Sequence, residues 1–154
     1  DLKRSQVKDG RITRRRSKTG EEGRLVSYKL WNTTAALLKE HMNTEGELAL
    51  TTKSGMPWVW AETLESGKIR NTDNVASIFK NLKRKIGMKD EGKSLKVFRK
   101  TSATWLKKNK KFKDLRFWFL GHSERTVADV HYADNSQADL DAAVKWLAGE
   151  YGVK

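Results

Sequence analysis

A capped amphipathic helix near the C-terminus is the feature that most constrains the fold of this chain. Ser136-x-x-Asp139 has the spacing of a capping box, in which each side chain bonds the backbone N–H of the other residue. Apolar side chains then recur at helical spacing, in a stripe that comprises Leu140, Ala143, Val144, Leu147 and Tyr151. Such a stripe has to be covered by apolar surface elsewhere, so the chain is expected to fold around this helix.

A β-hairpin is predicted near the start of the chain. Residues 11–16 and 24–30 carry Ile, Thr, Val and Tyr side chains on either side of the turn sequence SKTGEEG, which places Lys18 near the hairpin tip. Residues 47–51 are expected to form a third strand or an extended segment, and residues 58–71 a long loop.

Helical patterns account for most of the remaining residues. Helices are expected from about Asn32, over 75–86 with Thr72 or Asp73 as cap, over 97–108, over 114–120 and over 126–132. The helix over 97–108 is expected to bury Phe98, Ser102, Trp105 and Leu106. The sequence therefore predicts an α+β domain that is mostly helical and has one small antiparallel sheet.

Length and composition are those of one folded domain. The chain has 154 residues, of which 37% are hydrophobic and 33% are charged. It has no cysteine, which excludes disulfides, thiolate zinc sites and a cysteine nucleophile. No apolar run approaches the ~20 residues of a membrane span. Because the chain opens on Asp1 and not on Met, we expect the natural N-terminus to lie upstream.

The chain is strongly basic, with a formal net charge of +13, and the charge is clustered. Residues 1–20 carry eight Lys and Arg against two acids, residues 93–116 carry ten against one, and residues 124–154 carry six acids against three bases. Such clustering predicts a nucleic-acid surface rather than an evenly solvated one. The side chains expected to bind backbone phosphate are Lys80, Lys83, Arg84, Lys100, Lys107, Lys108, Lys110 and Lys111.

Five side chains are candidates for chemistry. Tyr132 has an ordinary pKa of about 10 and is a weak nucleophile at neutral pH, although nearby cations favour its phenolate. Arg99 has a planar fork that bonds two phosphate oxygens and stays charged. His122, after a Leu-Gly helix stop, can donate to a phosphate oxygen, while Lys18 and Lys96 can donate a proton or contact phosphate. Taken alone, each has an ordinary reading as a half-buried tyrosine, a helix cap or a solvated cation.

Neither a metal nor a nucleotide cofactor is expected. The three histidines, His41, His122 and His131, have no metal-ligand spacing supported by nearby acids. The chain also lacks the Gly-x-x-x-x-Gly-Lys loop that cradles nucleotide phosphates.

The order of the candidate residues is more specific than any one of them. Arg99 opens the run Arg-Lys-Thr-Ser-Ala-Thr, Leu-Gly-His122 follows 23 residues after the arginine, and His-Tyr132 follows with the tyrosine ten residues past His122. Upstream, Lys18 stands in Arg-Ser-Lys-Thr-Gly at the predicted hairpin turn. In these four ordered motifs the chain resembles the C-terminal catalytic domain of the tyrosine recombinase (phage integrase) family, over essentially its whole length.

The resemblance implies a DNA breaking-rejoining fold and a reaction like that of type IB topoisomerases, without ATP or metal. Tyr132 would attack a DNA phosphodiester to form a 3′-phosphotyrosyl link and free a 5′-hydroxyl. Arg99, the second of the family's two arginines, and His122 would stabilise charge on the phosphoryl oxygens, and Lys18 would be the general acid. The implied partners are duplex DNA and further copies in a synaptic tetramer, in the cytoplasm with the nucleoid. The C-terminal helix would join the copies, unless its stripe packs on its own domain.

The sequence departs from the family pattern in three places. Lys96 stands where the family usually has histidine, and because a lysine with a pKa of about 10.4 is protonated at neutral pH, we expect it to contact phosphate rather than act as a base. The interval from the histidine to the tyrosine is one residue longer than is commonest. The family's first arginine precedes the hairpin, and Arg4 is too close to Lys18 to take its place. We therefore expect residues 1–154 to be a partial catalytic domain, inactive by itself, without that arginine and without the N-terminal DNA-clamping domain.

Two other functions stay open. A non-catalytic duplex-DNA-binding fragment or decayed integrase would bind DNA in a salt-dependent way without forming a covalent adduct. A basic RNA-binding or ribosome-associated protein would fit the charge, but not the ordered series of lysine, arginine, Leu-Gly-His and tyrosine. A preference for single-stranded RNA over duplex DNA would favour that third class.

Overall fold

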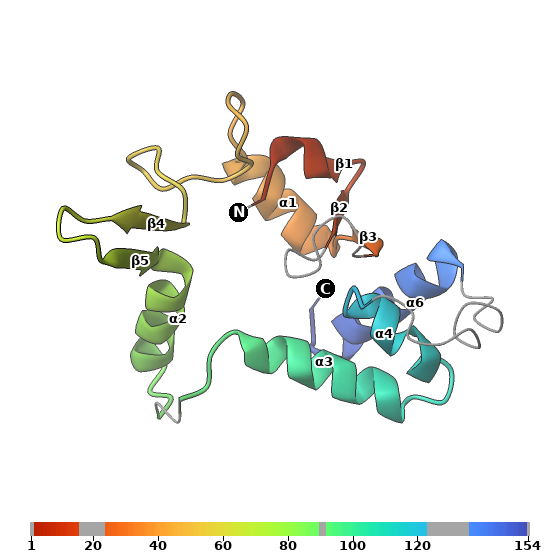
Figure 1. Cartoon of the computed structure of the whole chain (residues 1–154). Coiled ribbons are helices and arrows are strands. Elements are labelled where there is room, and N and C mark those ends of the chain that lie inside the picture. The colour runs from red at the N-terminus through yellow and green to blue at the C-terminus, as the bar shows by residue number, and fades with distance from the viewer. Residues whose placement is uncertain (1, 16–23, 90–91, 123–135, 154) are drawn as a thin grey trace. The chain divides into compact units, whose positions relative to one another are not determined.

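The structure, a computed structural model, describes residues 2–15, 24–89, 92–122 and 136–153 (Figure 1). These residues form an α+β fold with five helices and two small antiparallel sheets, so the predicted α+β class is confirmed and the prediction of a single sheet is wrong. The chain divides into two compact units. Unit 1 comprises residues 1–4 and 42–98, and unit 2 comprises residues 5–41 and 99–154.

The three-stranded sheet of unit 2 contains the predicted hairpin. A short 3-10 helix, η1 (Arg4–Gln6), leads into β1 (Val7–Lys8), β2 (Arg11–Arg15) and β3 (Leu25–Lys29), which pair in that order. The sequence analysis did not predict β1. Its turn to β2 is Asp9-Gly10, with φ of 51° and 67°, and left-handed values at both positions are what a two-residue hairpin turn needs.

The helices of unit 2 follow the predicted ranges. They are α1 (Asn32–His41), α3 (Lys96–Lys108), whose first turn belongs to unit 1, a 3-10 turn η3 (Lys113–Leu115), α4 (Arg116–Phe119) and α6 (Gln137–Glu150). The capping box is present, since the Ser136 N–H donates to Asp139 Oδ2 at 2.9 Å and the Asp139 N–H donates to Ser136 Oγ at 3.3 Å. The helix predicted over 126–132 lies outside the described residues.

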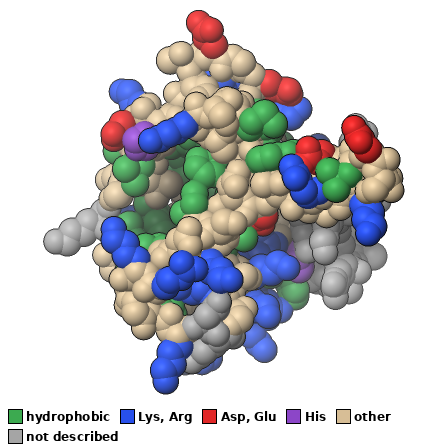
Figure 2. All heavy atoms as spheres, turned by 90° about the vertical axis from the view of Figure 1, so that its left-hand side faces the viewer, with side chains coloured by type: hydrophobic (Ala, Val, Ile, Leu, Met, Phe, Trp, Pro, Cys, Tyr) green, Lys and Arg blue, Asp and Glu red, His purple; other side chains and the backbone are tan. Residues whose placement is uncertain are grey.

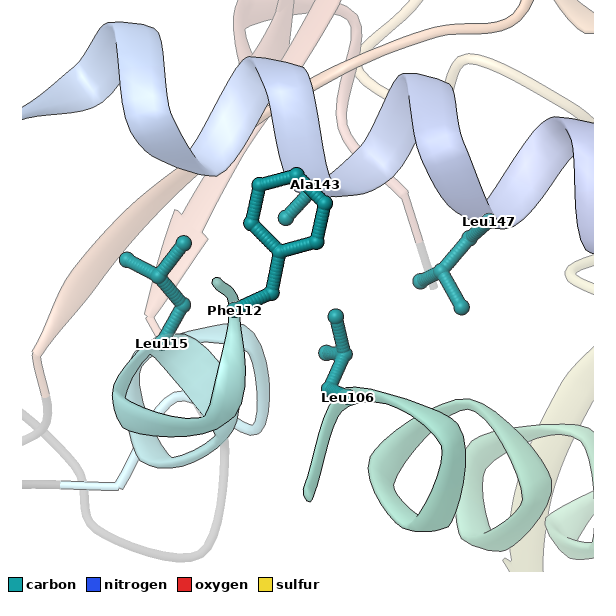
Figure 3. Close-up of a cluster of buried hydrophobic side chains, with 5 residues drawn as sticks. All are labelled: Leu106, Phe112, Leu115, Ala143 and Leu147. Atoms are coloured by element: carbon teal, nitrogen blue, oxygen red, sulfur yellow. The ribbon is translucent and has the colours of Figure 1, made fainter. Parts of the chain in front are cut away.

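The core of unit 2 is built around α6. Figure 3 shows Ala143 and Leu147 of α6 facing Leu106 at the end of α3, together with Phe112 and Leu115 from the segment that follows. A second buried cluster joins Leu140 and Val144 to Val26 of β3. The apolar stripe of α6 is therefore covered within its own unit, as the second of the two alternatives expects.

Unit 1 contains a hairpin that the sequence analysis took for a loop. Residues 58–71 hold β4 (Val59–Thr63) and most of its antiparallel partner β5 (Ile69–Asp73). The Gly67 N–H closes the turn on the carbonyl of Leu64 at 2.8 Å, with Gly67 at φ 76°. The prediction was wrong because polar side chains share both faces of these strands, so hydrophobicity does not alternate along them.

Helix α2 (Asn74–Lys85) of unit 1 begins and ends as predicted. The side chain of Asp73 accepts from the Ala76 N–H at 2.8 Å, and Gly87 at φ 68° follows the helix end. The expected strand or extended segment at 47–51 is also present, as an isolated bridge between Lys3 and Leu48.

Unit 1 buries little. Among its described residues only Ala49 and Lys83 are buried, while the apolar stripe of α2 includes Ile78 at 50% and Ile86 at 65% relative exposure. The helix over 97–108 was predicted to bury Phe98, Ser102, Trp105 and Leu106. Ser102 and Leu106 are buried and Trp105 is half-buried, but Phe98 is 48% exposed, with its ring 6.0 Å from the ring of Phe79. That part of the helix prediction is wrong.

Candidate phosphate-binding site

Helix α3 directs Arg99 toward the core side of unit 2. Arg99, Ser102 and Leu106 are spaced to share one helix face, and the latter two are buried. The hydroxyls of Ser102 and Tyr151 lie 2.9 Å apart, which holds this face against the end of α6. Arg99 Nη2 donates to the carbonyl oxygen of Leu120. The guanidinium is therefore aimed by the packing of its helix, although the Arg99 side chain as a whole is exposed.

The turn that receives Arg99 is the predicted Leu-Gly-His helix stop. Gly121, at φ 62°, donates its N–H to the carbonyl of Trp118 at 2.7 Å, and the His122 N–H donates to the carbonyl of Phe117 at 3.0 Å. This pair of bonds is a Schellman motif, which requires the left-handed conformation that glycine adopts at little cost. The His122 ring lies 6.1 Å from the Phe117 ring. The structure thus brings two predicted site residues, Arg99 and His122, to one turn.

Strand β3 contacts the same turn through Tyr28. The Tyr28 hydroxyl donates to the carbonyl of Phe119 at 2.7 Å, and the two rings meet edge to face at 6.0 Å. The carbonyls of Phe119 and Leu120 are consecutive, so Tyr28 and Arg99 bind adjacent peptide groups. Burial raises the pKa of Tyr28, while the positive charges of Arg99 and Arg14 act in the opposite direction.

A charged network fixes the hairpin to α6. Arg11 donates from Nη1 and Nη2 to the two carboxylate oxygens of Asp141, each at 2.7 Å. Gln137 Nε2 bonds the same carboxylate at 2.9 Å and the carbonyl of Ser27 at 3.0 Å. The hydrogen bond from Arg11 is the main cause that lowers the pKa of Asp141. The sheet and α6 are therefore held together at a part-buried, bidentate ion pair.

Of the other three predicted catalytic residues, only Lys96 lies in the part of the chain that the structure describes. Lys18 and Tyr132 both lie outside it, in residues 16–23 and 123–135. Lys96 is the exposed first residue of α3 and belongs to unit 1, whereas Arg99 belongs to unit 2. Their roles stay predictions.

Most of the predicted DNA-binding side chains are exposed. Figure 2 shows more Lys and Arg than Asp and Glu side chains on the face that it draws. In unit 1, Lys80 and Arg84 are exposed, and in unit 2 so are Lys100, Lys107, Lys108, Lys110 and Lys111. Lys83 differs, because it is 5% exposed and its ammonium donates to the carbonyl of Lys93 at 2.8 Å. We leave Lys83 out of any surface that contacts DNA.

Comparison of the chain with protein-family models, curated proteins and solved structures finds no match. Across the described residues, no group of three or more His, Asp or Glu side chains is gathered in a way that could hold a metal ion. No helix in the described part of the chain is long and apolar enough to cross a bilayer.

Sequence reasoning missed two residues near the turn, Tyr28 and Arg14. Each lies on a predicted strand, but the hairpin was not given a register, so neither side chain was assigned to a face. The available signal was alternation, since Val26 and Tyr28 mark the apolar face of one strand and Ile12 marks it on the other. Arg14, two positions from Ile12, is then a basic residue on an apolar face.

Proposed function

We propose that this chain carries catalytic residues of a tyrosine recombinase and that it cuts and rejoins duplex DNA through a 3′-phosphotyrosyl link. The observation that supports this most is the hydrogen bond from Arg99 to Leu120, in the turn that carries His122. An arginine and a histidine 23 positions apart in the sequence thus come to one place. These are the two side chains that the proposal assigns to the phosphoryl oxygens.

In the proposed reaction the Tyr132 oxygen attacks phosphorus, the bond from phosphorus to the 5′-oxygen breaks, and the 3′-phosphate stays on the tyrosine. The phenol loses its proton to water as the new bond forms. Lys18, protonated at neutral pH, gives a proton to the leaving 5′-oxygen. Arg99 and His122 stabilise the charge on the phosphoryl oxygens through charge-assisted hydrogen bonds. The bond energy is kept in the covalent link, so a 5′-hydroxyl of another strand can reverse the step without ATP.

The duplex would lie along the basic surface of unit 2. Lys100 and Lys107 are one heptad apart on one side of α3, and Lys108, Lys110 and Lys111 continue into the turn after it. Exposed lysines of this kind contact backbone phosphate and do not read bases. Lys96 is assigned to a phosphate contact as well. These phosphate contacts would fix the position of the protein on the duplex, and other contacts would provide its sequence preference.

Recombination joins two duplexes, so the proposal includes several copies of the chain on DNA. The apolar stripe of α6, which includes Leu140 and Leu147, is already covered by unit 2. Contacts between copies would therefore use another surface, and α6 would serve to hold the fold of each copy.

Covalent trapping tests the reaction. The protein as the cell makes it is mixed with nicked duplexes whose 5′-hydroxyl can diffuse away, and the duplexes tile the flanks of its gene. A denaturing gel is expected to show a protein–DNA adduct that Tyr132→Phe abolishes and Arg99→Ala strongly reduces. Thr34→Ala is the control, because it removes an exposed hydroxyl from α1 that has no part in the turn, and it should keep the adduct.

Other results would favour the other functions. Salt-dependent duplex binding without an adduct, on DNA shown to contain the preferred site, would mean a non-catalytic DNA-binding protein. Preference for single-stranded RNA over duplex DNA would mean an RNA-binding protein. An adduct that survives Tyr132→Phe would contradict the assignment of the nucleophile.

A further inference from the structure

Strand β2 presents three arginines in three different settings. Residues paired across antiparallel strands have their side chains on the same face, so Arg14, opposite Val26, shares the apolar face with Tyr28. Arg15, opposite Leu25, lies on the other face and is exposed. Arg11 is neutralised by Asp141.

The charges of Arg14 and Arg99 both act on Tyr28. Both guanidinium charges are close enough to the phenol to act on its pKa, in the direction opposite to burial. Arg14 is diagonal to Tyr28 across the β2–β3 pair, a separation that a long side chain spans. Arg99 binds Leu120, next to the carbonyl that Tyr28 binds. Arg14, which is 14 positions from Tyr28 along the chain, and Arg99, which is 71 positions away, therefore bring their charges to one edge of unit 2.

No acid offsets these two charges in the described part of the chain. Neither Arg14 nor Arg99 has an ion pair there, whereas Arg11 on the same strand has a bidentate carboxylate partner at 2.7 Å. Like charges near one another repel, and the repulsion is larger where burial lowers the effective dielectric. An anion held between the two guanidiniums would remove that cost and satisfy their remaining N–H donors.

We propose that Arg14 and Arg99 together bind one phosphate group, and that in the complex this is a backbone phosphate of the duplex. The second part rests on the proposed function, and the first does not. The site lies where the hairpin meets the Leu-Gly-His turn, so Arg14 supplies a second guanidinium in addition to that of Arg99. Arg14 is a binding residue in this proposal and not a participant in proton transfer.

The DNA part is tested by affinity against salt for Arg14→Gln and Arg15→Gln. The two variants lose the same charge from adjacent positions, on opposite faces of one strand. Losing a direct phosphate contact is expected to weaken duplex binding by about tenfold and to lower the slope of log affinity against log salt by about one. Arg15→Gln should change both far less. Equal effects of the two variants would mean that Arg14 contributes only nonspecific positive charge, and would overturn the proposal.

The phosphate part is tested without DNA. Inorganic phosphate is titrated into the protein while the side-chain Nε–H resonances of arginine are followed by NMR. The Arg14 and Arg99 signals should shift together in the wild type and in Arg15→Gln, and the Arg99 shift should be lost in Arg14→Gln. Arg14→Lys keeps the charge without the fork, so it should retain only part of the response.

The two tests distinguish failure of the proposed phosphate site from failure of the recombinase proposal. Phosphate binding that depends on Arg14, in a protein that forms no DNA adduct, would leave the anion site standing and refute the recombinase proposal. An adduct formed normally by Arg14→Gln, with an unchanged phosphate titration, would refute the site and leave the recombinase proposal standing. Arg14 has no partner in the core clusters, and unchanged backbone spectra would verify that the variant folds.

Discussion

Unit 2 and unit 1 contain similar elements but bury very different amounts of apolar surface. The five largest fully buried side chains all belong to unit 2, and they are Leu106, Leu115, Leu140, Leu147 and Val26. In unit 1 most apolar side chains of the hairpin and helix are exposed, including Ile69 at 67% and Ile86 at 65%. Both units contain helices and paired strands, so the secondary structure of unit 1 does not depend on a large buried core within that unit.

Local signals explain this regularity. Helix α2 has an N-cap at Asp73 and a glycine stop at Gly87, and α6 has the capping box of Ser136 and Asp139. Each such feature satisfies orphan backbone groups within a few residues. An apolar stripe, by contrast, predicts a helix and one face that needs cover, but it does not identify the cover. The stability that tertiary packing gives is therefore expected to be concentrated in unit 2.

The largest difference is expected between two leucine truncations. Leu106→Ala in the core of unit 2 should lower the free energy of unfolding by about 3–5 kcal/mol, because it removes buried methyl groups and leaves a cavity. Leu82→Ala on α2, where Leu82 is 50% exposed, should cost about 1 kcal/mol or less. Urea denaturation followed by far-UV circular dichroism measures both values. Equal costs would show that α2 is packed as tightly as α3.

The second difference is expected between two ion pairs. Arg11 and Asp141 form a bidentate pair with each side chain 24% exposed, whereas Arg70 and Glu62 pair across β4 and β5 at 62% and 39% exposure. Asp141→Asn should cost about 2 kcal/mol, since the charge-assisted bonds from Arg11 are lost. Glu62→Gln should cost at most about 0.5 kcal/mol, because exposed pairs are screened by solvent.

The pH dependence of the first pair has a definite sign. Because the folded-state pKa of Asp141 is lowered, its contribution is fully present above the ordinary pKa of 3.8 and is lost as pH falls through the folded value. Urea midpoints between pH 7 and pH 2 should therefore converge for the wild type and Asp141→Asn at the acid end. A constant gap between the two proteins down to pH 2 would contradict this assignment.

Much of the fold was predictable because it depends on turn residues, helix caps and periodic patterns within short stretches of sequence. The hairpin with β2 and β3, the helices α1, α2, α3 and α6, and both kinds of helix cap follow from turn chemistry and periodicity. Strand β1 was also within reach through Asp9-Gly10, a strong two-residue turn signal. Strands β4 and β5 could not be predicted in this way, because only the Ser66-Gly67 turn indicates them and the two faces of each strand do not differ in polarity. What covers a stripe is a long-range property, which is why the exposure of Phe98 was missed.

The candidate site was predictable to a smaller extent. Arg99 and His122 follow from ordered spacing, and their meeting at one turn depends on a glycine stop visible in the sequence. Arg14 and Tyr28 depend on strand register, because a shift of one residue would exchange Arg14 for Arg15 on the apolar face. Alternation along β2 and β3 indicates the apolar face of each strand, but the pairing of residues across them is fixed by the whole hairpin and by its docking on α6.

A third contrast compares two glycines in the same motif. Gly87 after α2 and Gly121 after α4 both end a helix in a Schellman motif, at φ 68° and 62°. Alanine at either position should cost about 1 kcal/mol from the left-handed backbone alone. Only Gly121→Ala should also reduce phosphate binding, because the turn carries His122 and the carbonyl that Arg99 binds. Denaturation and phosphate titration of both variants distinguish these effects, and equal loss of phosphate binding would contradict the placement of the site.

A small effect is expected at Tyr28 of unit 2, whose hydroxyl bonds the turn beside Arg99. Tyr28→Phe keeps the ring contact with Phe119 and removes one hydrogen bond, so the expected cost is about 0.5–1 kcal/mol at pH 7. Because burial raises the folded-state pKa of Tyr28, its contribution is fully present below the ordinary value of 10.0 and is lost as pH rises through the folded value. Urea midpoints of the wild type should therefore fall more steeply than those of Tyr28→Phe between pH 9 and pH 11. Parallel curves would mean that the phenol can ionise in the folded state without loss, and that the turn beside Arg99 is held by ring packing alone.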